Sequence, residues 1–318
     1  MGRGLIFHLC LILLVFASLA DIIVKDKTVM SVYGDEPAMR SGFPYALTLL
    51  QFDIDEYSSG APRDYVSRLR IQGLGGDDME RTVSVNRPVH LGFWRIYQMG
   101  YDVLPDGRPV SILECVKDPM WTLIAIGLWA LMLYSLFYAL RSVPRFHHRT
   151  MALASLFLFV VFVLYTLLRV GVGSGDLMPA LRSLWFIPHI VAYMLAYGIL
   201  TAVFIYSFFL WVRSLHKPFD KKSWPLLVAM TRVGFAFLGV GMAMGALWAK
   251  QSWGDWWSWD VKENWALVTW CGYALFLHLW FRVKPSWALC LQILSFLFLQ
   301  MTWWGVNLLP ATGSLHVY

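Results

Sequence analysis

The sequence from Trp253 to Trp265 reads WGDWWSWDVKENW and is the most distinctive stretch of the chain. It holds five tryptophans in thirteen residues, with Asp255, Asp260 and Glu263 among them. Tryptophan gathers at membrane interfaces, where its ring has an apolar body and a polar edge, so an interfacial belt is one interpretation. A belt, however, needs few rings at each helix end. A dense set of flat rings favours a platform for a large, flat, apolar ligand, because stacking and area burial both stabilise such a ligand there.

The composition indicates an integral membrane protein. The 318 residues are 58% hydrophobic and 14% charged, whereas soluble domains carry about 25% charged residues. The net charge of +6 does not form a basic stripe on a soluble fold, so a nucleic-acid partner is not expected. The four cysteines contain no C-x-x-C pair, which argues against a structural zinc site, a disulfide framework and a c-type haem attachment motif in this chain.

Seven apolar segments predict about seven transmembrane helices. The first, residues 5–24, resembles either a signal peptide or a membrane anchor, and its length of about 20 residues favours an uncleaved anchor. The other six spans are predicted at residues 119–140, 151–170, 187–212, 226–249, 265–281 and 286–305. The expected fold class is therefore an integral membrane, all-α protein with a small extracytoplasmic β domain.

The basic residues of the loops predict the orientation. Residues 141–150, 213–224 and 282–285 are rich in lysine and arginine, and such loops stay in the cytoplasm. Residues 171–186, the tryptophan-rich stretch and the C-terminal tail have few basic residues and are expected on the outer side.

The β domain is predicted at residues 25–118, a polar region rich in glycine and proline. Apolar residues alternate with polar ones, a pattern typical of half-buried strands. The alternating residues are Leu50, Phe52 and Ile54, then Leu69 and Ile71, then Val83 and Val85. This domain is expected on the same outer side.

Trp253-Gly254, Trp257, Trp259-Asp260 and Lys262-Glu263 together resemble the "WWD" signature of the CcsA (ResC) family of haem-handling proteins of cytochrome c assembly. Val261 stands where that family usually has proline, which is expected to loosen the loop and to leave the aromatic and acidic positions in place.

The N-terminal region resembles the extracytoplasmic domain of the ResB/CcsB family. The segments that carry this second resemblance are FDID at 52–55, YVSRL at 65–69, VNRP at 85–88 and Tyr97-Gln98. The two resemblances imply an anchor at 1–24, a ResB-like β domain at 25–118, and a CcsA-like six-helix domain at 119–318 with its outer loop at 250–265.

Four of the eight histidines are candidate axial ligands of haem iron. His189 and His316 are both expected on the outer side, flanking the tryptophan-rich stretch. His278 and His8 are both expected near the cytoplasmic ends of their helices. Neutral imidazoles bind haem iron from its two faces, and ionisable groups within a span are usually functional. Each has an alternative role. His189 could be bonded to backbone at its helix end, and His316 could lie in a frayed tail. His278 could be a packing residue, and His8 could be removed with a signal peptide.

The resemblance implies that haem b is carried across the bacterial cytoplasmic (inner) membrane and presented at the outer face. The residues expected to hold it there are Trp253, Trp256, Trp257, Trp259, Asp260 and Glu263. The implied partners are apocytochrome c with a C-x-x-C-H motif, a thiol reductant pathway, a separate ResB/CcsB-like protein and membrane lipid.

Three functional alternatives stay open in the sequence. The protein is either an enzyme that forms the thioether bonds or a chaperone that positions haem. A subunit of the other bacterial cytochrome c assembly system is a second possibility. A secondary transporter or quinone-linked redox protein is a third, although no pair of related halves with interrupted helices is evident.

Overall fold

The computed structural model describes residues 2–34, 36–73, 75–142, 149–170 and 176–305. The chain forms two compact units. The first comprises Met1–Leu128, Gly171–Phe186 and Ala246–Trp256, and the second comprises Trp129–Val170, Ile187–Gly245 and Trp257–Tyr318. The division falls inside the tryptophan-rich stretch, between Trp256 and Trp257, so its two parts belong to different units.

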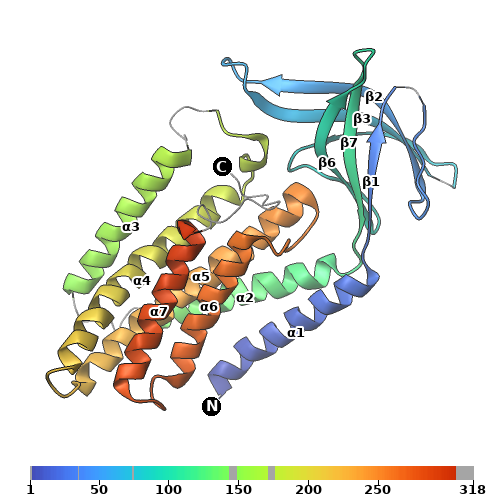
Figure 1. Ribbon diagram of the computed structural model, residues 1–318. Coiled ribbons are helices and arrows are strands. Elements are labelled where there is room, and N and C mark those ends of the chain that lie inside the picture. The colour runs from blue at the N-terminus through green and yellow to red at the C-terminus, as the bar shows by residue number, and fades with distance from the viewer. Residues whose placement is uncertain (1, 35, 74, 143–148, 171–175, 306–318) are drawn as a thin grey trace. The chain divides into compact units, whose positions relative to one another are not determined.

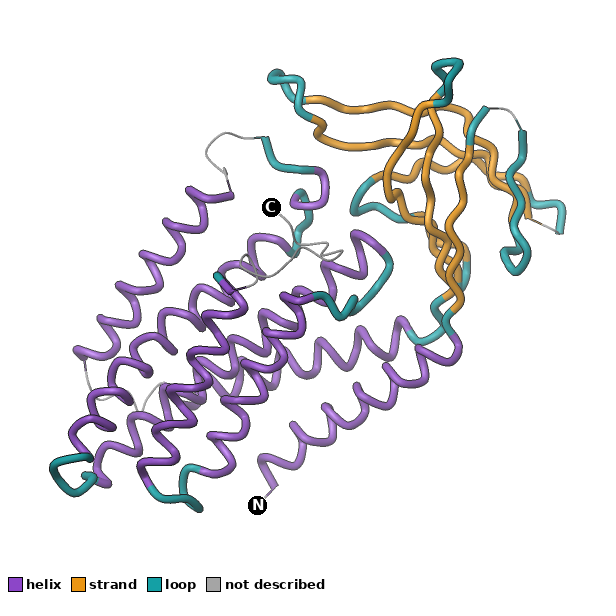
Figure 2. Tube along the Cα trace, in the orientation of Figure 1, coloured by secondary structure: helices purple, strands orange, loops and turns teal. Residues whose placement is uncertain are grey.

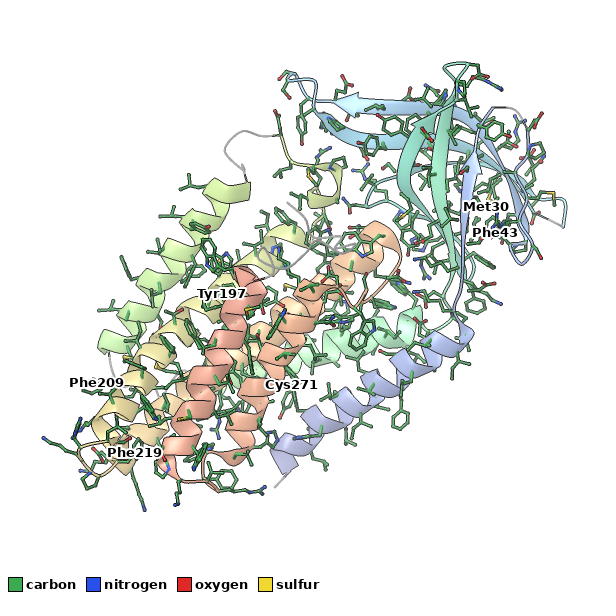
Figure 3. The ribbon with its side chains drawn as sticks, viewed as in Figure 1. Met30, Phe43, Tyr197, Phe209, Phe219 and Cys271 are labelled. Atoms are coloured by element: carbon green, nitrogen blue, oxygen red, sulfur yellow. The ribbon has the colours of Figure 1, made fainter. Side chains whose placement is uncertain are left out.

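The first unit contains helix α1 (Gly2–Val24) and a β domain of two antiparallel sheets (Figure 1). One sheet has the strand order β1-β7-β6-β5 and the other has the order β2-β3-β4. The strands are β1 (Asp26–Val32), β2 (Tyr45–Glu56), β3 (Pro62–Gly73), β4 (Asp78–Ser84), β5 (Val89–Leu91), β6 (Trp94–Val103) and β7 (Pro109–Lys117). Both sheets contribute to one apolar core, in which Met30 and Phe43 lie (Figure 3).

The strand pattern was predicted correctly in β3 and β4 and only in part in β2. Leu69, Ile71 and Val83 are fully buried, as predicted. In β2 the register shifts between Leu49 and Gln51. An extra residue at such a bulge reverses which face the following side chains occupy. Before the bulge, Leu47 and Leu49 are the buried residues. After it, Phe52 packs against the core, as predicted, whereas Ile54 is exposed.

The helices make up most of the second unit (Figure 2). They are α2 (Trp121–Ser142), α3 (Arg149–Val170), α4 (Phe186–Ser214), α5 (Trp224–Trp253), α6 (Val261–Leu279) and α7 (Pro285–Trp303), with short 3-10 turns η2 (Pro179–Leu181) and η3 (Lys221–Ser223). Helices α2 and α5 begin in one unit and end in the other.

Among the described residues, five helices are long and apolar enough to cross a membrane. The segments are Leu5–Val24, Trp121–Ser142, Phe186–Ser214, Lys221–Trp253 and Pro285–Trp303. The protein is therefore a multi-pass membrane protein with a β domain, and the class all-α holds only for its helical part. The spans predicted in α3 and α6 stay predictions, because α3 offers a shorter apolar segment, Met151–Tyr165, and α6 begins with polar residues.

Glycines bring α4 and α5 close together beside His189. A Cβ added at Gly245 would lie 2.9 Å from Cε1 of His189, and one added at Gly241 would lie 2.8 Å from Cδ2 of Tyr193. Such distances are shorter than van der Waals contact, so glycine is required at both positions if His189 and Tyr193 keep their places. Helix α5 is the most buried of the candidate membrane spans.

Candidate functional site

The start of the tryptophan-rich stretch lies on the outward face of the four-stranded sheet. Tyr97 of β6 and Val116 of β7 alternate with core residues, so their side chains point away from the sandwich core. A Cβ added at Gly254 would lie 3.0 Å from Tyr97 Cε2 and 3.1 Å from Val116 Cγ2. Gly254 also has a φ of +79°, which L side chains rarely adopt. The backbone conformation therefore strains any other residue at this position, and the close approach leaves little room for a side chain.

Asp255 connects the stretch to strand β1 through ion pairs. Its carboxylate pairs with Lys25 and with Lys27, whose Nζ lies 2.9 Å from Asp255 Oδ2. Lys27 also lies 2.7 Å from Glu114 Oε1 of β7. Burial alone would raise the pKa of Asp255, but the hydrogen bonds from the two lysines outweigh it, so the pKa of Asp255 lies below its ordinary value. The folded protein therefore favours the ionised form of this carboxyl.

The ion pairs of Asp255 predict an acid-sensitive contribution to stability. Because the folded-state pKa is depressed, the contribution is complete above the ordinary pKa of 3.8 and is lost as the pH falls through the lower folded-state pKa. We expect Asp255→Asn to lower the unfolding free energy by about 1–2 kcal/mol at neutral pH. Melting curves of the two proteins should converge below pH 3.8.

Glu80→Gln is the matched control for this comparison, because Glu80 pairs with Arg68 at 2.7 Å on an exposed surface. Exposed pairs of this kind contribute little. A difference between wild type and Asp255→Asn that stays the same from pH 7 to pH 3 would refute the assignment.

Lys250, in the last turn of α5, fixes the turn that follows the helix. Its Nζ donates a hydrogen bond to the carbonyl oxygen of Gly254 at 2.6 Å, pairs with Asp118, and lies 5.5 Å from the ring of Trp256. Lys250 and Asp118 are each 2% exposed. Asp21 of α1 lies beside Asp118. Lys250 is thus a buried cation paired with Asp118, and the carboxyl group of Asp21 lies close enough to act on its charge.

Asn86 joins three segments of the first unit. Its Nδ2 donates to the carbonyl oxygen of Pro179 at 2.9 Å, and its own carbonyl oxygen accepts from Gln251 Nε2 at 2.8 Å. Its Oδ1 accepts from Ser252 Oγ at 2.5 Å. Asn86 has a φ of +65°, a conformation that asparagine tolerates better than most residues. The side chain and backbone of one buried residue thereby connect the β4–β5 turn to η2 and to the end of α5.

The predicted platform tryptophans occupy different environments. In the first unit, Trp253 packs against Trp248 at 5.9 Å between ring centroids, Trp256 packs against Trp121 at 6.3 Å, and both motif rings are buried. In the second unit, Trp257 is half-buried and meets Trp259 edge-on at 6.3 Å. Trp259 is 66% exposed and has a φ of +58°, which is unusual for an aromatic residue.

Asp260 and Glu263 form a capping box at the start of α6. Asp260 Oδ1 accepts from the backbone N–H of Glu263 at 2.8 Å, and Glu263 Oε2 accepts from the N–H of Asp260 and, at 2.7 Å, from that of Ser258. Val261 is the first helical residue, a position where proline is favoured because its missing N–H is not needed. The capping box therefore holds the loop and helix start together without proline.

His189 lies in the first turn of α4 and faces α5. Its Nδ1 is 2.9 Å from the carbonyl oxygen of Gly241, and its ring packs edge-on against Tyr193 at 4.8 Å. A carbonyl can only accept, so in the neutral ring Nδ1 carries the proton and Nε2 carries the lone pair. Iron-ligating histidines usually make this second hydrogen bond.

An aromatic cluster that the sequence reasoning missed continues from His189. Tyr193 lies 6.0 Å from Tyr197, and Tyr197 of α4 (Figure 3) stacks on Trp303 of α7 at 4.8 Å. Trp303 in turn stacks on Trp304 at 6.4 Å. The adjacent tryptophans at the end of the last predicted span were the available signal.

The other predicted iron ligands are placed as follows. His278 lies on an exposed stripe of α6 with Cys271 and Leu275, and its Nδ1 is 2.7 Å from the carbonyl oxygen of Ala274. His8 lies exposed on α1, beside Phe7. His8 and His278 belong to different units, and His316 lies outside the described residues.

Lys250, Asp118 and Asn86 were not predicted as site residues. The signal for Lys250 was its position: a lysine at the outer end of a predicted span, where the positive-inside bias disfavours one. Nothing in the sequence pairs it with Asp118, more than 130 residues earlier.

These features define a multi-pass membrane protein in which a tryptophan-rich stretch begins on a β domain. The chain belongs to the Cytochrome C assembly protein family, whose family model matches residues 120–312. Residues 4–122 match the ResB-like family. The resemblances to both families are thereby confirmed.

The curated relatives are cytochrome c biogenesis proteins CcsA. That of Chlamydomonas reinhardtii is 32% identical over 158 residues, covering 46% of this chain and 43% of the relative. That of Prochlorococcus marinus strain MIT 9215 is 32% identical over 195 residues, covering 50% and 61%. The matched part therefore spans about half the length of these relatives.

Proposed function

We propose that the protein carries haem b from the cytoplasmic side of the membrane and presents it at the tryptophan-rich stretch for attachment to apocytochrome c. In that reaction the two thiols of a C-x-x-C-H motif add across the two vinyl groups of the porphyrin, so that each S–H bond and vinyl π bond is replaced by a C–S and a C–H bond. The protein supplies positioning, which by itself accelerates a reaction between bound partners.

The observation that carries the proposal is the docking of the tryptophan-rich stretch on the ResB-like domain. Gly254 rests on Tyr97 and Val116, and Asp255 pairs with Lys25 and Lys27. The stretch falls in the match to the Cytochrome C assembly protein family, and its partners fall in the match to the ResB-like family. An exposed Trp259 offers a ring to a ligand, and Asp260 and Glu263 hold the helix start behind it.

We propose His189 as an axial ligand at the outer face, with His316 as its counterpart. The hydrogen bond from His189 Nδ1 to Gly241 supports ligation through Nε2. His278 and His8 are proposed as the inner pair, and the bond from His278 Nδ1 to Ala274 supports the same tautomer there. Haem would then pass from the inner pair to the outer pair.

The proposed topology places residues 25–118, the segment before α4 and the tryptophan-rich stretch outside the cytoplasm of a bacterial inner membrane. Within the first unit, Tyr57 Oη donates to the carbonyl oxygen of Leu177 at 3.1 Å, and Trp248 Nε1 donates to that of Ala180 at 3.0 Å. These contacts support one common side for the three segments. The basic loops assign that side as the outer one.

The family membership disfavours the transporter and quinone-linked alternatives. The ResB-like match also favours the fused type of assembly protein over a subunit of the other bacterial system. An apocytochrome, a thiol reductant and a separate ResB/CcsB-like protein are the proposed partners. Whether the protein is called a synthase or a chaperone depends on whether positioning is counted as catalysis.

The proposal is tested by co-expression with an apocytochrome in cells that lack other maturation proteins. We expect covalent haem on a C-x-x-C-H apocytochrome and none on an S-x-x-S-H version, because serine hydroxyls do not add to vinyl groups under these conditions. Haem staining of denaturing gels measures the product. Absence of stained cytochrome with reduced, C-x-x-C-H acceptor present would contradict the proposal.

A further inference from the structure

Arg95 of β6 is a buried cation without an anionic partner in the described part of the chain. The residue is 7% exposed, and its Nε and Nη1 atoms have no hydrogen-bond acceptor among the described residues. The charge of Arg95 acts on the pKa values of nearby groups, which include His90 and Tyr97. Neither of these is an anion near neutral pH. Arg95 thus differs from Lys250, whose charge is balanced by Asp118.

The surroundings of Arg95 are aromatic and contain a further unused donor. The guanidinium carbon lies 4.7 Å from the ring of Trp121, which lies 6.3 Å from the ring of Trp256. Trp256 Nε1 is buried and, among the described residues, also has no acceptor. Three buried donor atoms around Trp121 therefore lack an acceptor among the described residues: Arg95 Nε, Arg95 Nη1 and Trp256 Nε1.

Buried donors and unpaired buried charges cost free energy, so each needs a physical explanation. The planar guanidinium fits a carboxylate with two parallel hydrogen bonds, a geometry that lysine does not offer. Trp121 and Trp256 provide the apolar ring surfaces that suit the body of an aromatic ligand. The missing partner is best matched by a carboxylate attached to a flat, apolar body.

We propose that Arg95 and Trp256 Nε1 bind a carboxylate of a flat amphipathic ligand. This inference rests on the proposed function, under which the carboxylate is a haem propionate. Arg95 belongs to the ResB-like region and Trp256 to the tryptophan-rich stretch. The ResB-like region would therefore contribute directly to haem binding, in addition to supporting the loop.

The test compares haem with haem dimethyl ester, in which both propionates are esterified, by titration into the purified full-length protein in detergent. We expect wild type to bind haem about 10- to 100-fold more tightly than the ester, because a charge-assisted hydrogen-bonded pair is lost with the ester. Arg95→Met should bind both porphyrins alike, at about the wild-type affinity for the ester. Trp256→Phe, which removes the N–H donor and part of the ring surface but keeps an aromatic ring, should reduce the discrimination about 2- to 10-fold.

The ligand-free melting temperature separates a binding role from a structural one. Replacing an unpaired buried charge by an apolar side chain should leave the melting temperature unchanged or raise it. Arg68→Met is the matched control, because Arg68 is an exposed arginine of the same domain, paired with Glu80, and it should keep the full discrimination.

Discrimination retained in Arg95→Met, or a lowered melting temperature of that variant with discrimination intact, would overturn the inference. If Arg95→Met does not fold, undiminished discrimination in Trp256→Phe does the same. Equal affinity of wild type for haem and its ester would overturn the inference and leave the proposed function standing. Failure of wild type to bind either porphyrin would overturn both.

Discussion

The His189→Gly protein is expected to accumulate in the membrane and to mature no cytochrome c. His189 is the one described histidine that packs in the contact between α4 and α5, with Nδ1 bonded to the Gly241 carbonyl at 2.9 Å. Loss of that hydrogen bond should cost only about 1 kcal/mol. Loss of an iron ligand, in contrast, would remove the outer haem site. Maturation is measured by haem staining and protein level by immunoblot.

Two further experiments, an imidazole rescue and a control variant, test whether the loss of maturation is due to the missing imidazole. Imidazole added to cells with His189→Gly should partly restore maturation, because the space left by the side chain lies against Gly245 and the free base can occupy the vacant coordination position. His216→Gly, a change in an exposed residue after α4, should behave as wild type. Normal maturation by His189→Gly at normal protein level would exclude His189 as a necessary ligand.

The Lys250→Met protein is expected to lose about 3–5 kcal/mol of unfolding free energy, because the change leaves Asp118 buried without its cation. Asp118 is 2% exposed and lies beside Asp21 of α1, so the uncompensated charge has no access to water. The hydrogen bond from Lys250 to the Gly254 carbonyl is lost as well. The thermal transition in detergent should shift to lower temperature, and maturation should fall with it.

A second substitution tests whether the charge pair is the cause. The double variant Lys250→Met with Asp118→Leu removes both charges and should recover most of the lost stability, since a buried ion pair can be replaced by apolar residues at little cost. Arg68→Met, at an exposed pair, should change the unfolding free energy by about 1 kcal/mol or less. Additive losses in the double variant, or an unchanged Lys250→Met protein, would show that this pair does not hold the loop.

The secondary structure of this chain could be predicted largely from its sequence. The apolar segments predicted the helices because each carries a long run without charge. The alternation at Leu69 and Ile71 predicted β3 because its polar neighbours lie on one face. In β2 the alternation marked the core-facing residue only at Phe52, because the bulge after Leu49 changes the face of each later side chain. A bulge depends on pairing with β3, which a single-sequence pattern does not contain.

The candidate site was predicted only in part. Residue type and spacing made the tryptophan-rich stretch and His189 candidates, because dense rings and a helix-end imidazole are unusual in themselves, and their roles stay predictions. Lys25 and Asp255 are 230 residues apart, and Arg95 reaches Trp256 only through Trp121. Partners of this kind depend on how the sheet is folded, so composition and local pattern cannot pair them.

The absorption spectrum of the purified full-length protein tests the central claim most directly. The account predicts that wild type purifies with haem showing the Soret and α bands of bis-histidine iron after reduction, and that addition of a reduced C-x-x-C-H apocytochrome transfers this haem into a covalent, stained product. A wild-type protein that is folded by its thermal transition but shows no Soret band, even after loading with haem, would contradict the account.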